Sequence, residues 1–462
     1  MNNYPISYLL LGLCSLRYFI FKFRLSFMPQ GQAKIGKVTA AAIVVANMVG
    51  TGAFTILGFQ LSHYSGTWAI MLLWVIGGVV AITGAFTYAE IATRLPRSGG
   101  EYHFLSEIYH PFLGYLSGWV SITVGFAASI SLAAMAIGSY IEHFLPFSGR
   151  LIASFSILIV ASVHSFDLKQ SSRFQNILTT FKVILVIVLI VAGFILLPSE
   201  PNALQWRGIH IWDTITQPTY VVSLVYVIYA FSGWNAAAYI TDEIEDAPRN
   251  LPKALLWGTS LVSILFILLQ LAFLRQAPIE ALQSKVEVGQ VVASLMFGET
   301  GGQVISFLIA GLLIAGISAM IWVGSRVTRT MAQDHEMWQY FSGDNRRGIP
   351  VRALWLQAGI SVFLVLTSSF EQVLIYSGFV LQLFTILTVF GLFKLRKNKT
   401  GEAEAFKSPL FPWLQIIFLV FNILILVYLL IEKPYESSLG LLNLLAGAIS
   451  YFWEKWRIIG TD

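Results

Sequence analysis

The segment Gly50-Thr51-Gly52-Ala53-Phe54 interrupts an apolar stretch that runs from about Val38 to Tyr64. The interruption falls roughly twelve residues into the stretch, which at about 1.5 Å per residue is near the middle of a ~30 Å hydrocarbon core. Glycine weakens a helix, and irregular backbone at that depth persists only where it is buried in protein or lines a cavity. Gly50 and Gly52 lie about 200° apart around a helix and cannot share a packing face, which favours a pocket over a tight helix contact.

A second break, Phe231-Ser232-Gly233-Trp234-Asn235, lies at a matching depth in the apolar stretch from about Pro218 to Thr241. Interrupted spans in corresponding positions of two halves are the best sequence pointer to the substrate site of a secondary transporter. We therefore expect both breaks to face one pocket near the bilayer midplane.

The composition excludes a soluble protein. Of the 462 residues, 56% are apolar and 11% are charged, against about 25% charged in soluble domains. No polar stretch reaches domain size, and no zinc-hydrolase, nucleophile-elbow or P-loop motif occurs, so we expect neither an enzyme nor a cofactor. The single cysteine, Cys14, rules out an intrachain disulfide. Basic residues are confined to short loops, which does not indicate nucleic-acid binding.

Apolar runs of about twenty residues predict an all-α polytopic membrane protein with twelve transmembrane helices. Their approximate centres are Gly50, Gly78, Gly125, Leu158, Ile187, Tyr229, Ile264, Ala315, Phe363, Phe384, Leu419 and Leu445. The broken spans are then the first and the sixth. Each repeat would contain five spans, and because five is an odd number, the second repeat enters the bilayer inverted. This predicts an inverted 5+5 repeat over 36–197 and 217–395, with two additional helices in 410–457.

Lysine and arginine are distributed unequally between alternate loops. Only five of the 29 lie on the side away from the termini, and one lies inside a span. These exceptions are Arg150, Arg207, Arg275, Lys285 and Lys433, and the residue inside a span is Lys182. The positive-inside rule therefore predicts cytoplasmic termini for an integral protein of the plasma (inner) membrane.

Residues 1–27 fit this organisation poorly. The apolar run from Ile6 to Leu16 is too short to cross a bilayer, and basic residues follow it rather than precede it, unlike a signal peptide. We favour translation from Met28, with a single membrane domain over 28–462, over the alternative of an interfacial anchor.

Four motifs occur in order between about residues 36 and 352. They are Asn47-Met48-Val49-Gly50-Thr51-Gly52-Ala53-Phe54; Leu95-Pro96-Arg97-Ser98-Gly99-Gly100-Glu101-Tyr102 with Pro111-Phe112-Leu113-Gly114-Tyr115; Gly233-Trp234-Asn235 with Pro248-Arg249-Asn250-Leu251-Pro252; and Ser325-Arg326-Val327 with Met331-Ala332-Gln333-Asp334 and Ile349-Pro350-Val351. Together they resemble amino-acid permeases of the amino acid–polyamine–organocation (APC) superfamily, close to the L-type and cationic amino-acid transporter branches. The resemblance implies the LeuT-type fold and transport of an amino acid or a related amine.

An amino acid carries two charges, and an unwound helix meets both of them. We expect the carboxylate at N–H groups around Thr51 and Gly52, with the Thr51 hydroxyl as a further donor. The ammonium would meet carbonyls near Met48, Tyr229 and Ser232, which the family pattern places at matching positions. The small size of Gly50, Gly52 and Gly233 would let the substrate approach the backbone closely.

Other site residues follow from the family registration. Tyr229 matches the gating aromatic, whereas gating and packing are equally open for Phe231. Gly125 and Ser129 share a face of the third span and are expected to line the side-chain pocket, with Met320 opposite. None of these positions is acidic, which disfavours lysine, arginine and polyamines as substrates.

Lys182 lies about ten residues into the fifth span, too deep to snorkel, so an interior role is favoured. In proton-coupled members of the superfamily a lysine here stands where sodium-coupled relatives bind a cation. The resemblance thus implies that Lys182 ties the first, fifth and eighth spans together and couples transport to protons.

The remaining ionisable residues at span ends are interpreted first as solvated anchors, with an inner gate as the alternative: Glu90, Arg94, Arg97, Asp242, Glu243, Arg249, Arg326 and Asp334. His63, His143 and His164 match no metal-ligand spacing. Three function classes stay open: an amino-acid carrier by proton symport or exchange, an amine or polyamine antiporter, and a substrate-binding sensor. Cys14 lies at the cytoplasmic end and cannot link an extracellular subunit, so a carrier with no obligate disulfide-linked partner is preferred.

Overall fold

The computed structural model describes residues 34–61, 66–166, 169–198, 216–401 and 404–459, together with residues 204 and 214. The predictions made for residues 1–27, Cys14 and His63 lie outside this range. In chain order the helices are α2 (Lys37–Met48), α3 (Gly52–Leu61), α4 (Thr67–Arg94), α5 (Glu101–Ile108), α6 (Pro111–Val120), the π-helical η1 (Ser121–Phe126), α7 (Ala127–Ile141), α8 (Gly149–Phe166), α9 (Lys169–Ile195), α11 (Pro218–Phe231), the 3₁₀-helical η2 (Ala236–Glu243), α12 (Ala247–Gln276), α13 (Ile279–Leu282), α14 (Val288–Asp334), the 3₁₀-helical η3 (Glu336–Phe341), α15 (Val351–Thr367), α16 (Phe370–Asn398), α17 (Trp413–Glu432) and α18 (Pro434–Ile459).

Eleven of the twelve predicted centres lie in helices, and the other, Gly50, lies between α2 and α3. In the described part of the chain, nine helices are long and apolar enough to cross a membrane. The other three positions hold α9, of which Thr180–Ile195 is a shorter apolar helix, α15, which is also short, and α18. The structure therefore shows an all-helical polytopic membrane protein, whereas the count of twelve spans and the inverted repeat stay predictions.

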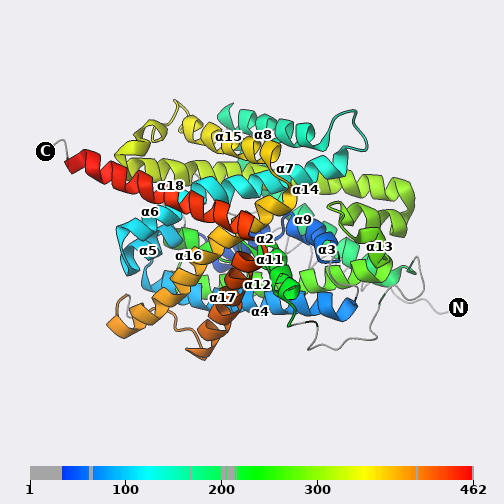
Figure 1. The fold of residues 1–462 in the computed structure, drawn as a ribbon, viewed down its shortest axis with the longest axis horizontal. Helices are drawn as coiled ribbons and strands as arrows, with labels where there is room; N and C mark the ends of the chain where they lie inside the picture. Colours follow the sequence, from blue (N-terminus) through cyan, green and yellow to red (C-terminus); the bar gives the residue numbers. More distant parts are fainter. Residues whose placement is uncertain are drawn as a thin grey trace.

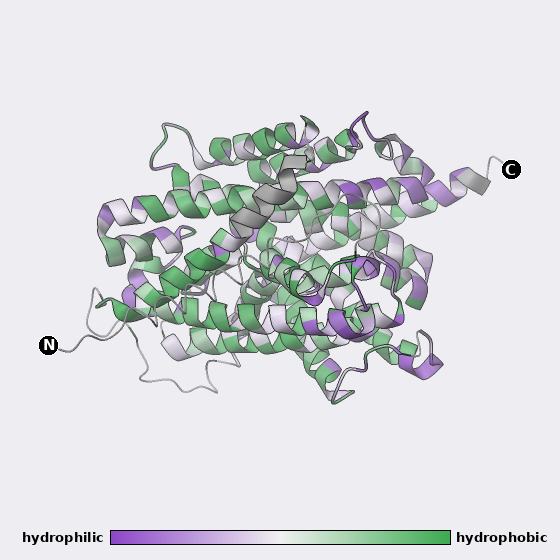
Figure 2. Cartoon of the chain, turned by 180° about the vertical axis from the view of Figure 1, so that it is seen from behind, coloured by the Kyte–Doolittle hydropathy of each residue, from purple (hydrophilic) through white to green (hydrophobic). Residues whose placement is uncertain are grey.

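The two broken spans lie inside the bundle. Figure 1 shows α2 and α11 between a layer that contains α7, α8, α14 and α15 and a second layer that contains α4, α12 and α17. Figure 2 shows hydrophilic residues gathered mainly at the end of the molecule where α18 ends, while hydrophobic residues dominate the helices elsewhere. The breaks thus lie where lipid contact is excluded, which is the condition for irregular backbone at membrane depth.

Glu90 is buried, so its interpretation as a solvated anchor at the end of a span is wrong. Its side chain, near the end of α4, is fully buried and accepts hydrogen bonds from both Arg94 and Arg396. The Arg396 Nη2 atom lies 2.6 Å from one carboxylate oxygen, and the Ser408 amide donates to the same oxygen at 2.8 Å. Glu90 therefore joins α4, α16 and the segment before α17 through a buried ion-pair network.

Two other span-end residues, both on α14, also have side-chain partners. Asp334, at the end of α14, accepts a hydrogen bond of 2.9 Å from the Tyr102 hydroxyl of α5. Arg326 stacks on Trp322, with 3.8 Å between the guanidinium carbon and the ring centroid. The Tyr102–Asp334 bond joins α14 to α5, whereas the Arg326–Trp322 contact lies within α14, one turn apart.

Candidate functional site

The first break is a loss of helical hydrogen bonding between α2 and α3. α2 ends at Met48, and the Gly50 amide turns back to the Met48 carbonyl at 2.9 Å instead of reaching four residues back. α3 begins at Gly52, and the Thr51 carbonyl accepts from Phe54 at 3.0 Å. Among the described residues, the amides of Thr51, Gly52 and Ala53 donate to no backbone carbonyl. These amides form the positive end of α3.

The second break follows the end of α11. The Ser232 amide closes the helix on the Tyr229 carbonyl at 2.9 Å, and Gly233 then adopts a φ of +94°. The chain resumes as the 3₁₀-helical η2 at Ala236. Helix geometry leaves the last carbonyls of α11 without intrahelical donors, so this break presents acceptors where the first presents donors.

The two breaks touch each other through glycines. A Cβ on Gly52 would stand 2.5 Å from the Ala230 Cα, and a Cβ on Gly233 would stand 2.9 Å from the Asn47 carbonyl. Both glycines therefore permit close approach of the two chains, whereas the sequence predicts that they make room for substrate. Gly50 differs, because a Cβ there would meet nothing closer than the Met48 carbonyl at 4.0 Å. Of the three predicted glycines, Gly50 has space beside it.

Three predicted residues from three spans meet at the first break. The Tyr229 hydroxyl of α11 lies close to the side chains of Thr51 and Ser129. Ser129, on α7, donates to the Gly125 carbonyl at 2.7 Å. Gly125 belongs to the π-helical η1, and π-helical turns occur frequently at functional sites. The sequence predicts these four residues at one site, but it does not indicate the π-helix that widens the third span there.

Exposure differs across the breaks. Ser232 and Asn47 are exposed, Gly50, Gly125, Ser129 and Gly233 are half-buried, and Thr51 and Tyr229 are buried. Every residue of α3 except Phe59 is buried, whereas α2 has several half-buried and exposed positions. The exposed positions beside the breaks are thus on α2 and directly after α11.

Phe231 lies in a packing position. Its ring is 1% exposed and lies 5.9 Å from the Trp74 ring of α4 and 5.4 Å from the Phe266 ring of α12. Its carbons also stand 3.1 Å from where a Cβ on Gly77 would be. The structure favours the packing alternative for Phe231. Met320 is half-buried on α14, and its carbonyl accepts a hydrogen bond from Gln357 of α15 at 3.3 Å. The expected place of its side chain in the pocket stays a prediction.

Lys182 is buried inside the bundle, at 4% exposure, on α9. Its Nζ lies 3.7 Å from the point that a Cβ on Gly316 of α14 would occupy. Among the residues whose side chains the structure describes, no carboxylate lies within ion-pair distance of this ammonium. The structure thus places Lys182 between the fifth and eighth spans, and the expected link to the first span stays a prediction.

Two buried polar residues that hold α3 were not predicted. The Tyr140 hydroxyl of α7 donates to the Phe54 carbonyl at 2.9 Å and accepts from the Gly289 amide at 3.1 Å. Gln270, in the middle of α12, donates to the Ala53 carbonyl at 3.0 Å. A glutamine in an otherwise apolar span is a signal that the sequence does offer, because such side chains need a partner.

Glu101 is a third residue that the sequence indicates only as part of a motif. Its buried carboxylate, at the start of α5, accepts hydrogen bonds from Tyr88, Asn235 and Tyr239. Asn235 and Tyr239 belong to the second break and to η2, so Glu101 fixes this half of the sixth span against α4 and α5. Its role is to position backbone beside the site.

The sequence is similar to known proteins along nearly its whole length. The amino acid permease family matches residues 35–449. The b(0,+)-type amino acid transporter 1 of Mus musculus is 26% identical over 437 residues, covering 91% of this chain and 88% of the relative. The serine/threonine exchanger SteT of Bacillus subtilis is 25% identical over 440 residues, covering 92% and 97%. The large neutral amino acids transporter small subunit 2 of Homo sapiens is 26% identical over 443 residues, covering 91% and 80%.

The family match, over residues 35–449, includes both breaks, the residues around Tyr229 and the Lys182 position. Transporters and an exchanger of amino acids are similar to the chain over that length. The chain therefore belongs to the amino acid permease family, and its function is to transport an amino acid rather than to catalyse a reaction.

Proposed function

We propose that the chain exchanges neutral amino acids across the cytoplasmic membrane, with the substrate held between the two breaks. The observation that carries this is the meeting of Thr51, Tyr229 and Ser129 beside the free amides of α3. None of the contacts described for these three residues involves an acidic side chain, which a cationic substrate would need. The names of similar proteins, a serine/threonine exchanger and a large neutral amino acids transporter, support the same class.

The substrate's two charges would bind opposite helix ends. The carboxylate would accept from the amides of Thr51, Gly52 and Ala53, where the α3 dipole is positive. The ammonium would donate to the last carbonyls of α11, where the dipole is negative. The substrate α-carbon would lie beside Gly50, the glycine with open space, and its side chain would point toward Ser129 and Gly125.

The orientation and the repeat belong to the same proposal. We infer cytoplasmic termini and an inverted repeat in which α2/α3 and α11/η2 are the corresponding broken spans. The asymmetry between buried α3 and more exposed α2 supports a conformation open to the cytoplasm. Ile35 and Glu243 are joined by an amide-to-carbonyl bond of 2.8 Å, and the Glu245 amide returns to Ile35 at 2.9 Å. The cytoplasmic ends of both broken spans would therefore move together.

Lys182 supports an alternative to pure exchange, in which transport is coupled to protons. A buried ammonium is costly at membrane depth, and no carboxylate among the described side chains lies within ion-pair distance of Lys182. Proton release toward the cytoplasm would then accompany substrate movement. If transport is pure exchange, the same ammonium instead holds α9 against α14 throughout the cycle.

Counterflow in proteoliposomes tests the proposal. Purified protein is reconstituted with one unlabelled amino acid inside, and uptake of a labelled panel of neutral, basic and acidic amino acids and amines is measured. We expect trans-stimulated uptake of neutral amino acids only. Uptake of basic amino acids or polyamines alone would contradict the substrate class, and substrate binding without trans-stimulation would indicate a sensor. A pH gradient, imposed in parallel, separates proton-driven accumulation from exchange.

A further inference from the structure

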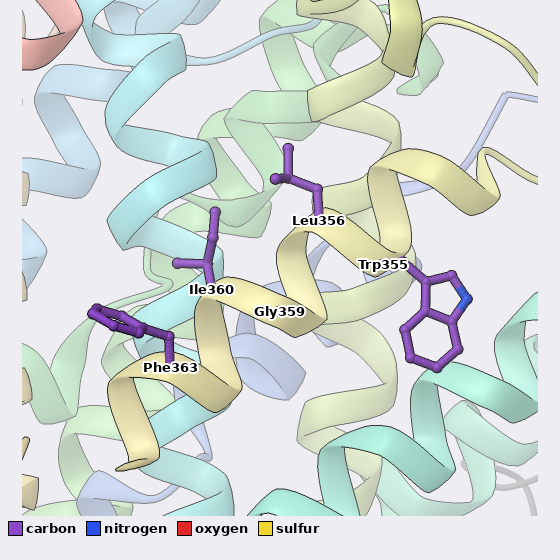
Figure 3. A pocket seen from close by; sticks show the side chains of 5 residues that line it. All are labelled: Trp355, Leu356, Gly359, Ile360 and Phe363. Carbon is purple, nitrogen blue, oxygen red and sulfur yellow. The ribbon is translucent and has the colours of Figure 1, made fainter. Parts of the chain in front are cut away.

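A groove on the outer surface of α15 is unconnected with the substrate site. It has a volume of about 400 Å³ and is lined by Trp355, Leu356, Gly359, Ile360 and Phe363 (Figure 3). Its lining is apolar, and Phe363 and Trp355 are 63% and 39% exposed. A Cβ on Gly359 would meet nothing within 4 Å, so the hollow at this glycine is not filled by a neighbouring helix.

One end of the groove is basic. Arg352 is exposed on the first turn of α15, four residues before Leu356, and therefore lies on the same helix face. Its guanidinium stacks 4.3 Å from the Tyr340 ring centroid and donates to the Tyr340 carbonyl at 3.2 Å, which fixes it at this end. Arg346 and Arg347 are also exposed in the preceding loop, where Arg347 donates to the Phe166 carbonyl at the end of α8. Asp344 of the same loop is paired with Arg329 at 2.7 Å.

The length of the groove matches one leaflet. Arg352 and Phe363 are eleven positions apart, which is about 16 Å along a helix. Half of a ~30 Å hydrocarbon core is about the same distance. Arg352 then lies at the level of the lipid head groups while Phe363 reaches the bilayer midplane, and the exposed rings of Trp355 and Tyr340 lie near the interface, where such rings are enriched.

We propose that this groove binds an anionic diacyl phospholipid of the cytoplasmic leaflet, with one acyl chain over Gly359 and its phosphate at Arg352. The inference rests on the proposed orientation but not on the substrate class. Charge complementarity selects an anionic head group, because a basic cluster beside an apolar intramembrane groove on the cytoplasmic side is the arrangement that binds such lipids. A neutral sterol would leave the arginines unused.

Native mass spectrometry of the full chain tests the site. Detergent-solubilised protein is mixed with phosphatidylglycerol or phosphatidylcholine of identical acyl chains, and retained lipid is counted at increasing collision energy. We expect wild type to retain phosphatidylglycerol preferentially. Arg352→Gln should lower its apparent affinity about fivefold and leave phosphatidylcholine unchanged, because one basic residue contributes that much near an anionic membrane surface.

A second variant, Gly359→Leu, tests the shape of the groove. Its larger side chain should fill the groove and reduce retention of both lipids. The matched controls are Arg249→Gln, which removes an exposed charge at the start of α12, and Val420→Leu, which adds bulk to the exposed face of α17. If Gly359→Leu does not fold, Arg352→Gln decides alone, since its side chain is exposed. Equal retention of the two lipids by wild type, unchanged binding to Arg352→Gln, or a dimer cross-linked through α15 would each overturn the proposal.

Discussion

Gly50 and Gly52 lie two residues apart in one break, yet the structure predicts opposite consequences for adding a side chain to each. A Cβ on Gly52 would stand 2.5 Å from the Ala230 Cα, about 1 Å inside the ~3.5 Å at which carbon atoms pack. α3 cannot yield easily, since Tyr140 and Gln270 hold its carbonyls. Gly52→Ala should therefore cost about 1–3 kcal/mol of stability, as overpacking of a core does.

Gly50→Ala has no such clash, because nothing lies closer than 4.0 Å to its added Cβ. Its stability should stay within about 0.5 kcal/mol of wild type, while its apparent substrate affinity falls, because the methyl group enters the space assigned to the substrate α-carbon.

The assay measures both quantities on the same preparations. Thermal unfolding in detergent without substrate reports stability, and substrate-dependent stabilisation together with counterflow reports binding. Gly311→Ala is a matched control, since its Cβ would also meet nothing within 4 Å. A Gly52→Ala protein as stable as wild type would refute the packing argument. A Gly50→Ala protein with unchanged affinity would refute the position assigned to the substrate.

Three further predictions concern single side chains. If wild type accumulates substrate in a pH gradient, Lys182→Ala should lose that accumulation yet keep substrate binding. Lys182→Arg should do the same because arginine stays protonated. Undiminished accumulation by the alanine variant would make Lys182 structural. Glu90→Gln should lower stability by about 3 kcal/mol, since it leaves Arg94 and Arg396 uncompensated, whereas a loss below 1 kcal/mol in thermal unfolding would show that the network is solvated. Tyr229→Phe should raise the half-saturating substrate concentration in counterflow about fivefold by removing the hydroxyl beside Ser129, and an unchanged value would exclude that hydroxyl from the site.

The positions of the breaks could be predicted from the sequence because glycine and membrane depth act locally. α2 ends at Met48, two residues before the first predicted segment, and α11 ends at Phe231, the first residue of the second. The joining of Thr51, Tyr229 and Ser129 could be predicted only through the family resemblance, because spacing within one span does not say which other span it faces.

The packing roles of Gly52 and Gly233 could not be predicted. The spacing of Gly50 and Gly52 shows that the two cannot pack on one face of the same helix, but it does not show whether each packs against a different neighbouring segment. Gly52 faces Ala230 and Gly233 faces Asn47. Glu90 was misassigned for a similar reason. Its partner Arg396 lies 306 positions away, and a charge at a span end looks solvated until the helix that covers it is known.

Lys182 differs in kind from the other polar residues buried at mid-span. Tyr140 and Gln270 each donate to a carbonyl at the start of α3, so their burial is compensated by bonds that fix one half of a broken span. Lys182 is as deeply buried, and no carboxylate among the described residues neutralises it. A group kept only for packing would be more stable as an apolar side chain of similar volume. The free-energy cost of burying this ammonium is offset only if its charge has a function in transport. Removing the charge should therefore change transport activity more than it lowers the stability of the fold.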